Sequence, residues 1–186
     1  SESNLGNLYR RLRSVGDGKY AFVDFEQYLP SYDAPASFIG APIAREGKRI
    51  GYVAFQMPID RINSVMGAID GLGKTGEVLL VGGDRLMRSD SRRDPGARSV
   101  VASFRHPDAG RLDLPAVRSA IDGKTGTETA DDGKGGKDLV AYAPLEVLGT
   151  KWAVIARIAA DEVYAASAEI EHAAAETLAQ ILHWSI

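Results

Sequence analysis

Apolar and polar positions follow two periods along the chain, which predict a mixture of helices and strands. Leu5, Leu8 and Leu12 recur at the period of an amphipathic helix, which is predicted over residues 4–15. Segments rich in aromatic and β-branched residues, with polar turns between them, are typical of antiparallel strands. Such strands are predicted at residues 20–28, 37–43, 50–57, 77–81, 85–89, 100–104, 125–130, 139–145 and 151–158.

The remaining periodic segments predict three further helices. Residues 58–70 open with a proline, which suits a first helical turn, and carry apolar residues along one face. Short helical periodicity follows at residues 115–121, and the Ala-rich sequence from Ala160 predicts a long helix to the C-terminus. An approximate apolar stripe on that last helix would pair with a second copy or pack on its own sheet. The stripe consists of Val163, Ile170, Ala174 and Ile181.

A weak internal repeat organises these elements. Residues 38–60 align without gaps on residues 140–162, so that Gly47 falls on Gly149 and each copy reads strand, turn, strand, helix. On this interpretation residues 58–160 form a complete unit with five short strands, whereas residues 1–57 hold only the C-terminal half of another. A three-stranded sheet with one short helix buries little apolar area. We therefore expect the natural polypeptide to continue upstream of residue 1.

Composition excludes several classes of function. The 186 residues are 45% hydrophobic and 25% charged, which is ordinary for one or two globular domains. A net charge of -3 gives no reason to expect a nucleic-acid partner. The sequence has no cysteine, so it has no disulfide framework, thiolate metal site or cysteine nucleophile. No apolar run approaches the roughly 18 residues that span a bilayer.

Sequences that look catalytic lack the surroundings that their chemistry needs. Residues 71–76 match G-x-G-x-x-G, but they follow a predicted helix and precede a strand, the reverse of a phosphate-binding loop. A helix cap and turn are expected there. His106, His172 and His183 are too far apart for a metal pair, and a hydrolase built on Asp90 or Asp131 would lack a base–nucleophile constellation. We predict no enzymatic activity, no cofactor and no metal.

One polar segment is a candidate for binding. Residues 87–92 read Met-Arg-Ser-Asp-Ser-Arg, a dense mixture of donors and acceptors where a predicted strand ends. Converging polar groups beside an apolar sheet are typical of a small-molecule pocket. A salt-bridged, solvent-exposed strand end is the alternative.

Several segments together resemble the double Cache (dCache) sensor domain of bacterial chemoreceptors and sensor histidine kinases. They are YVAFQMPIDRIN at 52–63, GKTGE at 73–77, LMRSDSR at 86–92, GKTG at 123–126, AYAPL at 141–145, Trp152-Ala153, and upstream Asp24-Phe25 through 35–39.

The resemblance implies an α+β fold. Its main unit would be a PAS-like antiparallel five-stranded sheet flanked by helices, with a partial second PAS-like unit at the N-terminus and a long C-terminal helix. Residues 1–57 would be the C-terminal half of the membrane-distal unit and residues 58–160 the membrane-proximal unit. Residues 161–186 would be a helix leading toward a transmembrane segment outside this chain.

The resemblance also implies a function. The chain would be the periplasmic ligand-sensing region of an inner-membrane receptor, homodimeric in the full protein, in which a small molecule shifts the exit helix. In relatives that bind amino acids, an aspartate late in the last distal strand holds the ligand's amino group, and that position is Gln56 here. A glutamine carries no charge to pair with an ammonium.

The ligand-binding candidates fall into two groups. Tyr28, Tyr32 and Gln56 belong to the distal half, and Arg88, Ser89, Asp90 and Tyr142 belong to the proximal unit. Arg88 would suit a carboxylate ligand. The alternative function is a structural or dimerisation module of a membrane receptor that binds no ligand.

Overall fold

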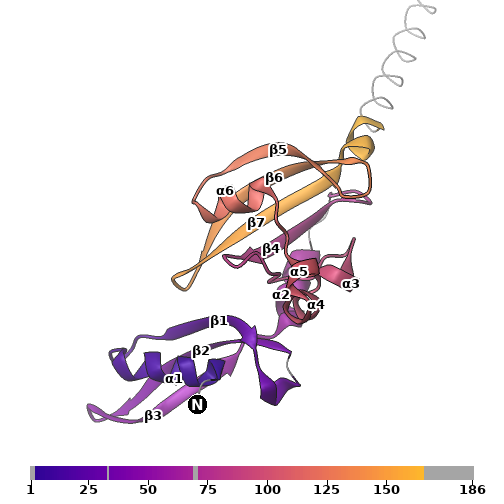
Figure 1. Cartoon of the computed structure of the whole chain (residues 1–186). Coiled ribbons are helices and arrows are strands. Elements are labelled where there is room, and N and C mark those ends of the chain that lie inside the picture. The colour runs from indigo at the N-terminus through magenta and orange to yellow at the C-terminus, as the bar shows by residue number, and fades with distance from the viewer. Residues whose placement is uncertain (1–2, 33, 69–70, 166–186) are drawn as a thin grey trace, which may run out of the picture.

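Two antiparallel sheets form the framework of the protein, as seen in a computed structural model that describes residues 3–32, 34–68 and 71–165. Figure 1 shows the sheets one above the other, with short helices between them. The first sheet has the order β1-β2-β3, from β1 (Ala21–Gln27), β2 (Pro35–Arg45) and β3 (Lys48–Gln56). The second has the order β4-β7-β6-β5, from β4 (Glu77–Gly82), β5 (Gly126–Asp131), β6 (Lys137–Val147) and β7 (Thr150–Ala159).

Helices cover one face of each sheet. Helix α1 (Asn4–Ser14) begins at Ser3, whose hydroxyl accepts from a backbone N–H of the first turn, and buries Leu8 and Leu12 against β1 and β2. Helix α6 (Pro115–Ile121) packs on β6 and β7 in the same way. The connecting elements are 3₁₀ helix η1 (Leu29–Ser31), α2 (Ile59–Gly67), α3 (Pro95–Arg98), α4 (Val100–Arg105) and α5 (Pro107–Gly110).

The main hydrophobic core crosses from one sheet to the other. Phe22 and Phe25 of β1 belong to the same buried cluster as Leu79 of β4 and Ile155 of β7. A smaller cluster lies between α1 and the first sheet. Because apolar side chains of both sheets leave water together, the two sheets stabilise each other.

The internal repeat is present in the structure. Strands β2 and β3 join through Glu46 and Gly47, with φ of 52° and 74°, and β6 and β7 join through Leu148 and Gly149, with φ of 53° and 82°. Two consecutive left-handed residues form the turn that matches the twist of a two-residue hairpin. The repeat departs from a gapless alignment at a bulge in β3, where Ile50 has no partner in β2. From Gly51 to the end of β3, each residue therefore corresponds to the β7 residue one position before the one that the gapless alignment gives.

The second sheet has four strands among the described residues, whereas the sequence predicted five. Residues 85–89 contribute a single bridge, between Val81 and Met87, because the chain turns sharply at Arg85, with a φ of 67°, and then leaves the sheet. Residues 100–104 form helix α4 and not a strand. The Ser99 hydroxyl accepts from Ala102 N–H at 3.1 Å and so caps this helix.

The chain is helical from Ala160 to Ala165, directly after β7. The rest of the predicted long helix, with most of its apolar stripe and His172 and His183, lies outside the described residues. Within residues 3–32, 34–68 and 71–165, no helix has the length and apolar character needed to cross a bilayer.

The hairpin geometry predicts that Gly47→Ala and Gly149→Ala each lower the free energy of unfolding by about 1 kcal/mol, since a side chain strains a left-handed backbone. Urea unfolding would measure the change. Gly51→Ala in β3 is the control, because Gly51 has open space around its Cα and no left-handed φ. An equal loss at Gly51 would show that backbone conformation is not the cause.

Candidate functional site

A polar cavity of about 330 Å³ lies between α2, β4 and residues 90–92. Its polar lining comes from Asn63, Glu77, Asp90, Ser91 and Arg92, and its apolar lining includes Met66 and Leu72. The cavity therefore combines opposite charges and apolar surface, as small-molecule sites do. The predicted polar segment 87–92 supplies three of these side chains.

Asp90 joins two helices at the rim of the cavity. Asn63 of α2 donates to the Asp90 carboxylate at 2.8 Å and accepts from the Asp90 backbone N–H at 2.8 Å. The other carboxylate oxygen accepts from Val100 N–H at 2.6 Å, at the start of α4. Asp90 remains solvent-exposed, and a carboxylate has about four lone-pair positions, so it can accept further hydrogen bonds from a bound molecule.

A buried network of charges fixes the wall of the cavity. Glu77 accepts from the hydroxyl of Ser91 at 2.9 Å and pairs with Arg157 of β7 at 2.6 Å. Asp138 of β6 pairs with Arg93 at 3.0 Å, and Arg157 approaches the same carboxylate at 3.8 Å. Two carboxylates and two guanidiniums alternate, so each buried charge has a partner. The segment that lines the cavity is thereby anchored to the sheet.

The cavity is connected to the helix that follows β7 through the turn at residues 73–75. Arg92 donates to the carbonyl oxygens of Gly73 and Lys74 at 3.2 and 3.3 Å. The backbone N–H groups of Lys74 and Thr75 donate to the carboxylate of Glu162 at 2.6 and 2.8 Å, and the Thr75 hydroxyl also donates to it. Hydrogen bonds from the Thr75 hydroxyl and from the two backbone N–H groups lower the pKa of Glu162.

The glycine-rich segment therefore holds an anion that belongs to the chain itself. Gly73 has a φ of 64°, and a Cβ there would lie 2.2 Å from a Glu162 oxygen. A side chain at residue 73 would strain this left-handed backbone and displace the Glu162 carboxylate. The sequence predicted a cap and turn at residues 71–76, but not the carboxylate that occupies it.

Arg88 forms a second cluster, where the two sheets meet. Its Nε and Nη2 donate to the two carboxylate oxygens of Asp24 in β1, at 2.9 and 2.8 Å. Nη2 also donates to Asp84 at 3.1 Å, and Nη1 to the carbonyl oxygens of Leu86 and Met87 at 3.0 and 3.5 Å. A guanidinium has five N–H donors, and these contacts use all of them.

Aromatic rings and burial complete the Arg88 cluster. Phe25, Phe104 and Trp152 place their rings within 6.0 Å of the guanidinium carbon, and Trp152 donates to Asp24 at 3.1 Å. Arg88 is 2% exposed. Burial alone would lower the pKa of Arg88, but the hydrogen bonds and charges of Asp24 and Asp84 raise it above its ordinary value. Arg88 is a permanent cation inside the protein.

The seven predicted ligand-binding residues do not converge. Arg88 is enclosed and bonded to protein acceptors, so a free carboxylate cannot reach it, and the buried Ser89 hydroxyl accepts from Leu80 N–H at 2.8 Å. Asp90 lines the cavity described above. Tyr142 is half-buried and lines a separate hollow of about 350 Å³ on β5, β6 and β7.

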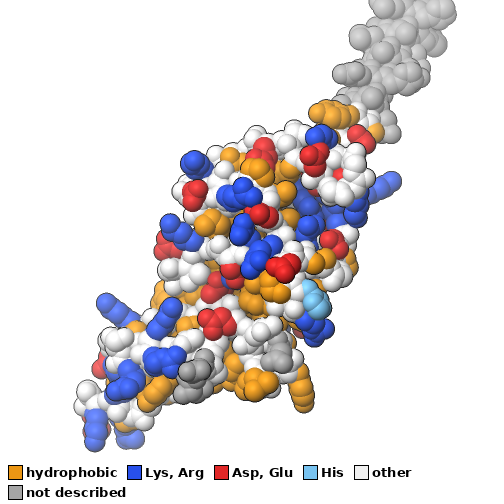
Figure 2. Space-filling model, in the orientation of Figure 1, with side chains coloured by type: hydrophobic (Ala, Val, Ile, Leu, Met, Phe, Trp, Pro, Cys, Tyr) orange, Lys and Arg blue, Asp and Glu red, His pale blue; other side chains and the backbone are white. Residues whose placement is uncertain are grey.

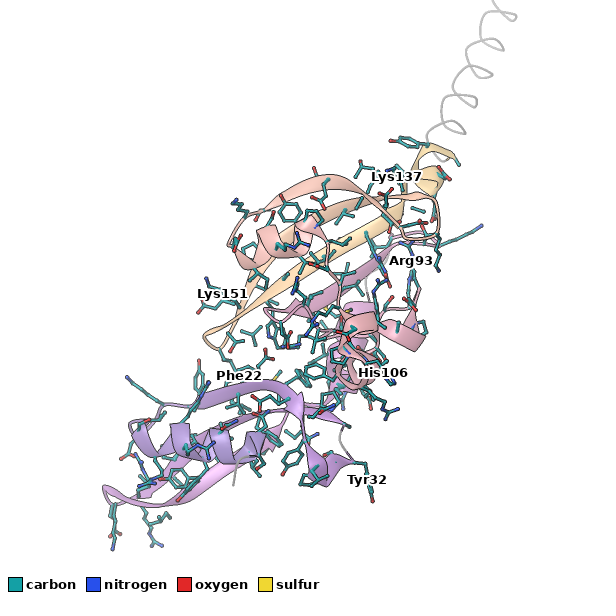
Figure 3. All side chains as sticks on the ribbon, in the orientation of Figure 1. Phe22, Tyr32, Arg93, His106, Lys137 and Lys151 are labelled. Carbon is teal, nitrogen blue, oxygen red and sulfur yellow. The ribbon has the colours of Figure 1, made fainter. Side chains whose placement is uncertain are left out.

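The three distal candidates lie on the first sheet and its loops. Tyr28 is half-buried and packs edge-on against Phe38, with ring centroids 5.0 Å apart. Tyr32 is 95% exposed, and Figure 3 shows it at the periphery, beyond η1. Gln56 is exposed at the end of β3. Their role in ligand binding stays a prediction.

Sequence reasoning missed the acidic partners of both clusters. Asp24 interrupts an apolar strand between Val23 and Phe25, and such a polar residue in a buried segment could have indicated a buried ion pair. Glu77 and Glu162 carry no comparable local signal. Among the residues that the structure describes, no group of three or more His, Asp or Glu residues could hold a metal ion.

Comparison with known proteins identifies the fold. No protein-family model and no curated protein sequence matches the chain. The extracellular domain of vpHK1S-Z8, a protein assigned as a histidine kinase, aligns at 12% identity with a TM-score of 0.57, over 86% of this chain and 57% of that one. The ligand-binding domain of the Pseudomonas aeruginosa amino acid chemoreceptor PctB, in complex with L-Gln, aligns at 19% identity with a TM-score of 0.53, over 91% and 63%.

A third solved structure agrees with these two. The ligand-binding domain of the Pseudomonas aeruginosa chemoreceptor PctC, in complex with GABA, aligns at 15% identity with a TM-score of 0.52, over 81% of this chain and 60% of that one. The architecture is therefore an α+β fold with antiparallel sheets of three and four strands. It is the Cache-type fold that the sequence motifs indicated. This chain spans less than two thirds of the length of each of these structures.

We predict that Arg88→Ala lowers the free energy of unfolding by about 3 kcal/mol or more, because Asp24 loses the partner of a buried pair. Arg88→Lys should recover only part of the loss, since an ammonium cannot form the two parallel bonds. The control is Arg111→Ala, which removes a pair with the fully exposed Asp108 and should change stability by less than about 0.5 kcal/mol. Equal effects in chemical denaturation would contradict the special role of Arg88.

A second prediction concerns pH. Because the folded-state pKa of Glu162 is lowered, its contribution to stability is fully present above the pKa of an unfolded glutamate. That contribution is lost as pH falls through the folded-state value. The stability difference between wild type and Glu162→Gln should therefore shrink in urea unfolding as the buffer is taken from pH 7 to pH 3. A difference that stays constant over this range would refute the assignment.

Proposed function

We propose that this chain is the extracytoplasmic ligand-sensing region of a bacterial transmembrane receptor, and that the cavity beside Asp90 receives a small polar ligand. The observation that supports the proposal most is the set of contacts from the cavity through Arg92 and the turn at 73–75 to Glu162. This set ends at the helix that follows β7. A molecule in the cavity can therefore act on that helix through neighbouring hydrogen bonds.

The cavity favours a ligand with both an amino and a carboxylate group. Asp90 offers an exposed carboxylate, and Arg92 an exposed guanidinium, on the same cavity. An ammonium group would pair with the first and a carboxylate with the second. The solved chemoreceptor domains of the same fold are complexes with L-Gln and with GABA, which belong to this chemical class. Arg92 thus takes the role for which the sequence suggested Arg88.

The domain organisation inferred from the sequence fits this proposal. Residues 1–57 would be the C-terminal half of a membrane-distal unit and residues 58–160 the membrane-proximal unit. Residues 161–186 would lead toward the inner membrane, with this region in the periplasm, no catalytic activity and a homodimer in the full receptor. Tyr28, Tyr32 and Gln56 would contribute to a second site in the distal unit.

Signalling would follow from differential affinity. A ligand that bridges Asp90 and Arg92 binds best when the cavity is closed, and it stabilises that arrangement by the difference in its affinity for the closed and open states. Closing moves the Arg92 guanidinium, which holds the carbonyl oxygens of the turn at 73–75. The opposite side of that turn holds Glu162, so the start of the helix moves with it.

Calorimetric titration with a panel of amino acids and GABA tests the proposal. We expect at least one of them to bind, and Asp90→Ala and Arg92→Ala each to weaken binding by about tenfold or more, as loss of a charge-assisted hydrogen bond does. Asp108→Asn is the matched control, since Asp108 is a fully exposed carboxylate away from the cavity, and it should bind as wild type does. If no compound of this class binds, the ligand-free structural module becomes the better interpretation.

Glu162→Gln separates binding from transmission in the same experiment. This variant should still bind the ligand, because Glu162 does not line the cavity, and its affinity should change only by the coupling between the turn and the cavity. It should lose the ligand-induced slowing of amide hydrogen exchange at residues 159–162. A ligand response at those amides that survives in Glu162→Gln would exclude the proposed route.

A further inference from the structure

We propose that Gln27 is a positioning residue for Asp90 and acts through helix α4, so that the first sheet regulates the affinity of the cavity. This regulation presupposes the proposed ligand site beside Asp90. Gln27 is an exposed residue at the end of β1, whereas the cavity wall belongs to β4 of the other sheet. In Figure 1, α4 lies among the short helices between the two sheets.

The N-terminal end of α4 depends on Asp90 for one of its hydrogen bonds. Val100 is the first residue of the helix, and the N–H groups of a first turn have no acceptor within the helix. The Ser99 hydroxyl accepts from Ala102 N–H, and the Asp90 carboxylate accepts from Val100 N–H at 2.6 Å. This carboxylate also lies at the positive end of the helix dipole. Protection of the Val100 amide therefore depends on the position of Asp90.

The C-terminal end of α4 depends on Gln27 in a similar way. The carbonyl groups of a last turn have no donor within the helix. The side-chain amide of Gln27 donates to the carbonyl oxygen of Phe104 at 3.1 Å, across 77 residues of sequence. His106, which follows the helix, is exposed and is the pale blue side chain on the surface in Figure 2. Substitution of the exposed Gln27 therefore removes this hydrogen bond without removing a buried apolar group.

Between its two ends, α4 is short and is anchored at one point. Its 6 residues, at 1.5 Å each, span about 9 Å. The fully buried Ser103 accepts from Met87 N–H at 3.2 Å and donates to the Val100 carbonyl at 2.9 Å, both through its hydroxyl. A helix of this length moves as one body. A displacement of Phe104 by Gln27 therefore tilts the helix about Ser103 and shifts Val100.

The carboxylate of Asp90 is held by two helices that both lead to the first sheet. Asn63 of α2 donates to one oxygen at 2.8 Å, and Val100 of α4 donates to the other. Helix α2 follows β3 directly, and α4 is connected to β1 by Gln27. A ligand ammonium would use the lone-pair positions that remain on Asp90. A rearrangement of the first sheet would thus change the affinity by moving this acceptor, without contacting the ligand.

Amide hydrogen exchange of the 186-residue chain, without any ligand, tests the role of Gln27. Gln27→Ala and Gln27→Glu should each speed exchange at Val100 about fivefold, as loss of one neutral hydrogen bond does, because neither side chain can donate. Gln27→Lys should stay close to wild type, since an ammonium donates and suits the C-terminal end of a helix. Lys48→Ala is the control, because Lys48 is an exposed residue of β3 in the same sheet, and it should leave exchange at Val100 unchanged.

Two further measurements distinguish positioning from a general loss of stability. Exchange at Ile155, which is fully buried in β7, should be the same in all these proteins. In an Asp90→Ala background Val100 has already lost its acceptor, so Gln27→Ala should add less than about twofold there. Unchanged exchange at Val100, equal acceleration at Val100 and Ile155, or full additivity with Asp90→Ala would each overturn the proposal. Because no ligand is used, these outcomes are independent of the calorimetric titration that tests the cavity.

Discussion

The buried pair of Arg88 and Asp24 is the interaction on which the arrangement of the two sheets depends. Arg88 lies shortly after β4 of the second sheet, and Asp24 lies in β1 of the first sheet. Neither charge is stable in an apolar interior without the other, so the sheets cannot separate at this point without exposing or stranding a charge. Gly82 makes the contact feasible, because a Cβ there would lie 2.2 Å from the guanidinium. The shared hydrophobic core forms around this pair.

Local sequence signals predicted the hairpins well and the long-range contacts poorly. Gly47 and Gly149 favour the left-handed backbone of a hairpin turn, and such a turn involves only neighbouring residues of the chain. The repeat was therefore visible in the sequence. The α4 segment was misread because Val100 and Val101 suggest a strand, while the decisive signal is the capping hydroxyl of Ser99. The partners of Arg88 lie up to 64 residues away, and no local pattern encodes that distance.

The candidate site could also be predicted only in part from the sequence. A polar segment at residues 87–92 could be recognised as a site from its composition, and it does line the cavity. The sequence could not show which of these side chains face the cavity. The direction of each side chain depends on how the chain turns back after Arg85 and on which acidic residue pairs with Arg88. That return buries Arg88 and Ser89 and leaves Asp90 and Arg92 exposed. Met87, Arg88 and Ser89 are buried in succession, so the segment does not alternate as a strand does, and the bends at residues 88 and 89 decide which side chains face the cavity.

The turn at residues 73–75 connects the cavity with the helix because its two sides have opposite polarity. Carbonyl oxygens on one side accept from the guanidinium of Arg92, and N–H groups on the other donate to the carboxylate of Glu162. The glycine-rich sequence that resembles a nucleotide-binding loop thus serves as an anion site within the chain, as expected of backbone N–H groups left free at a tight turn. A cation at the cavity and an anion at the helix polarise the same peptide groups, so a change at either end alters the strength of the contact at the other.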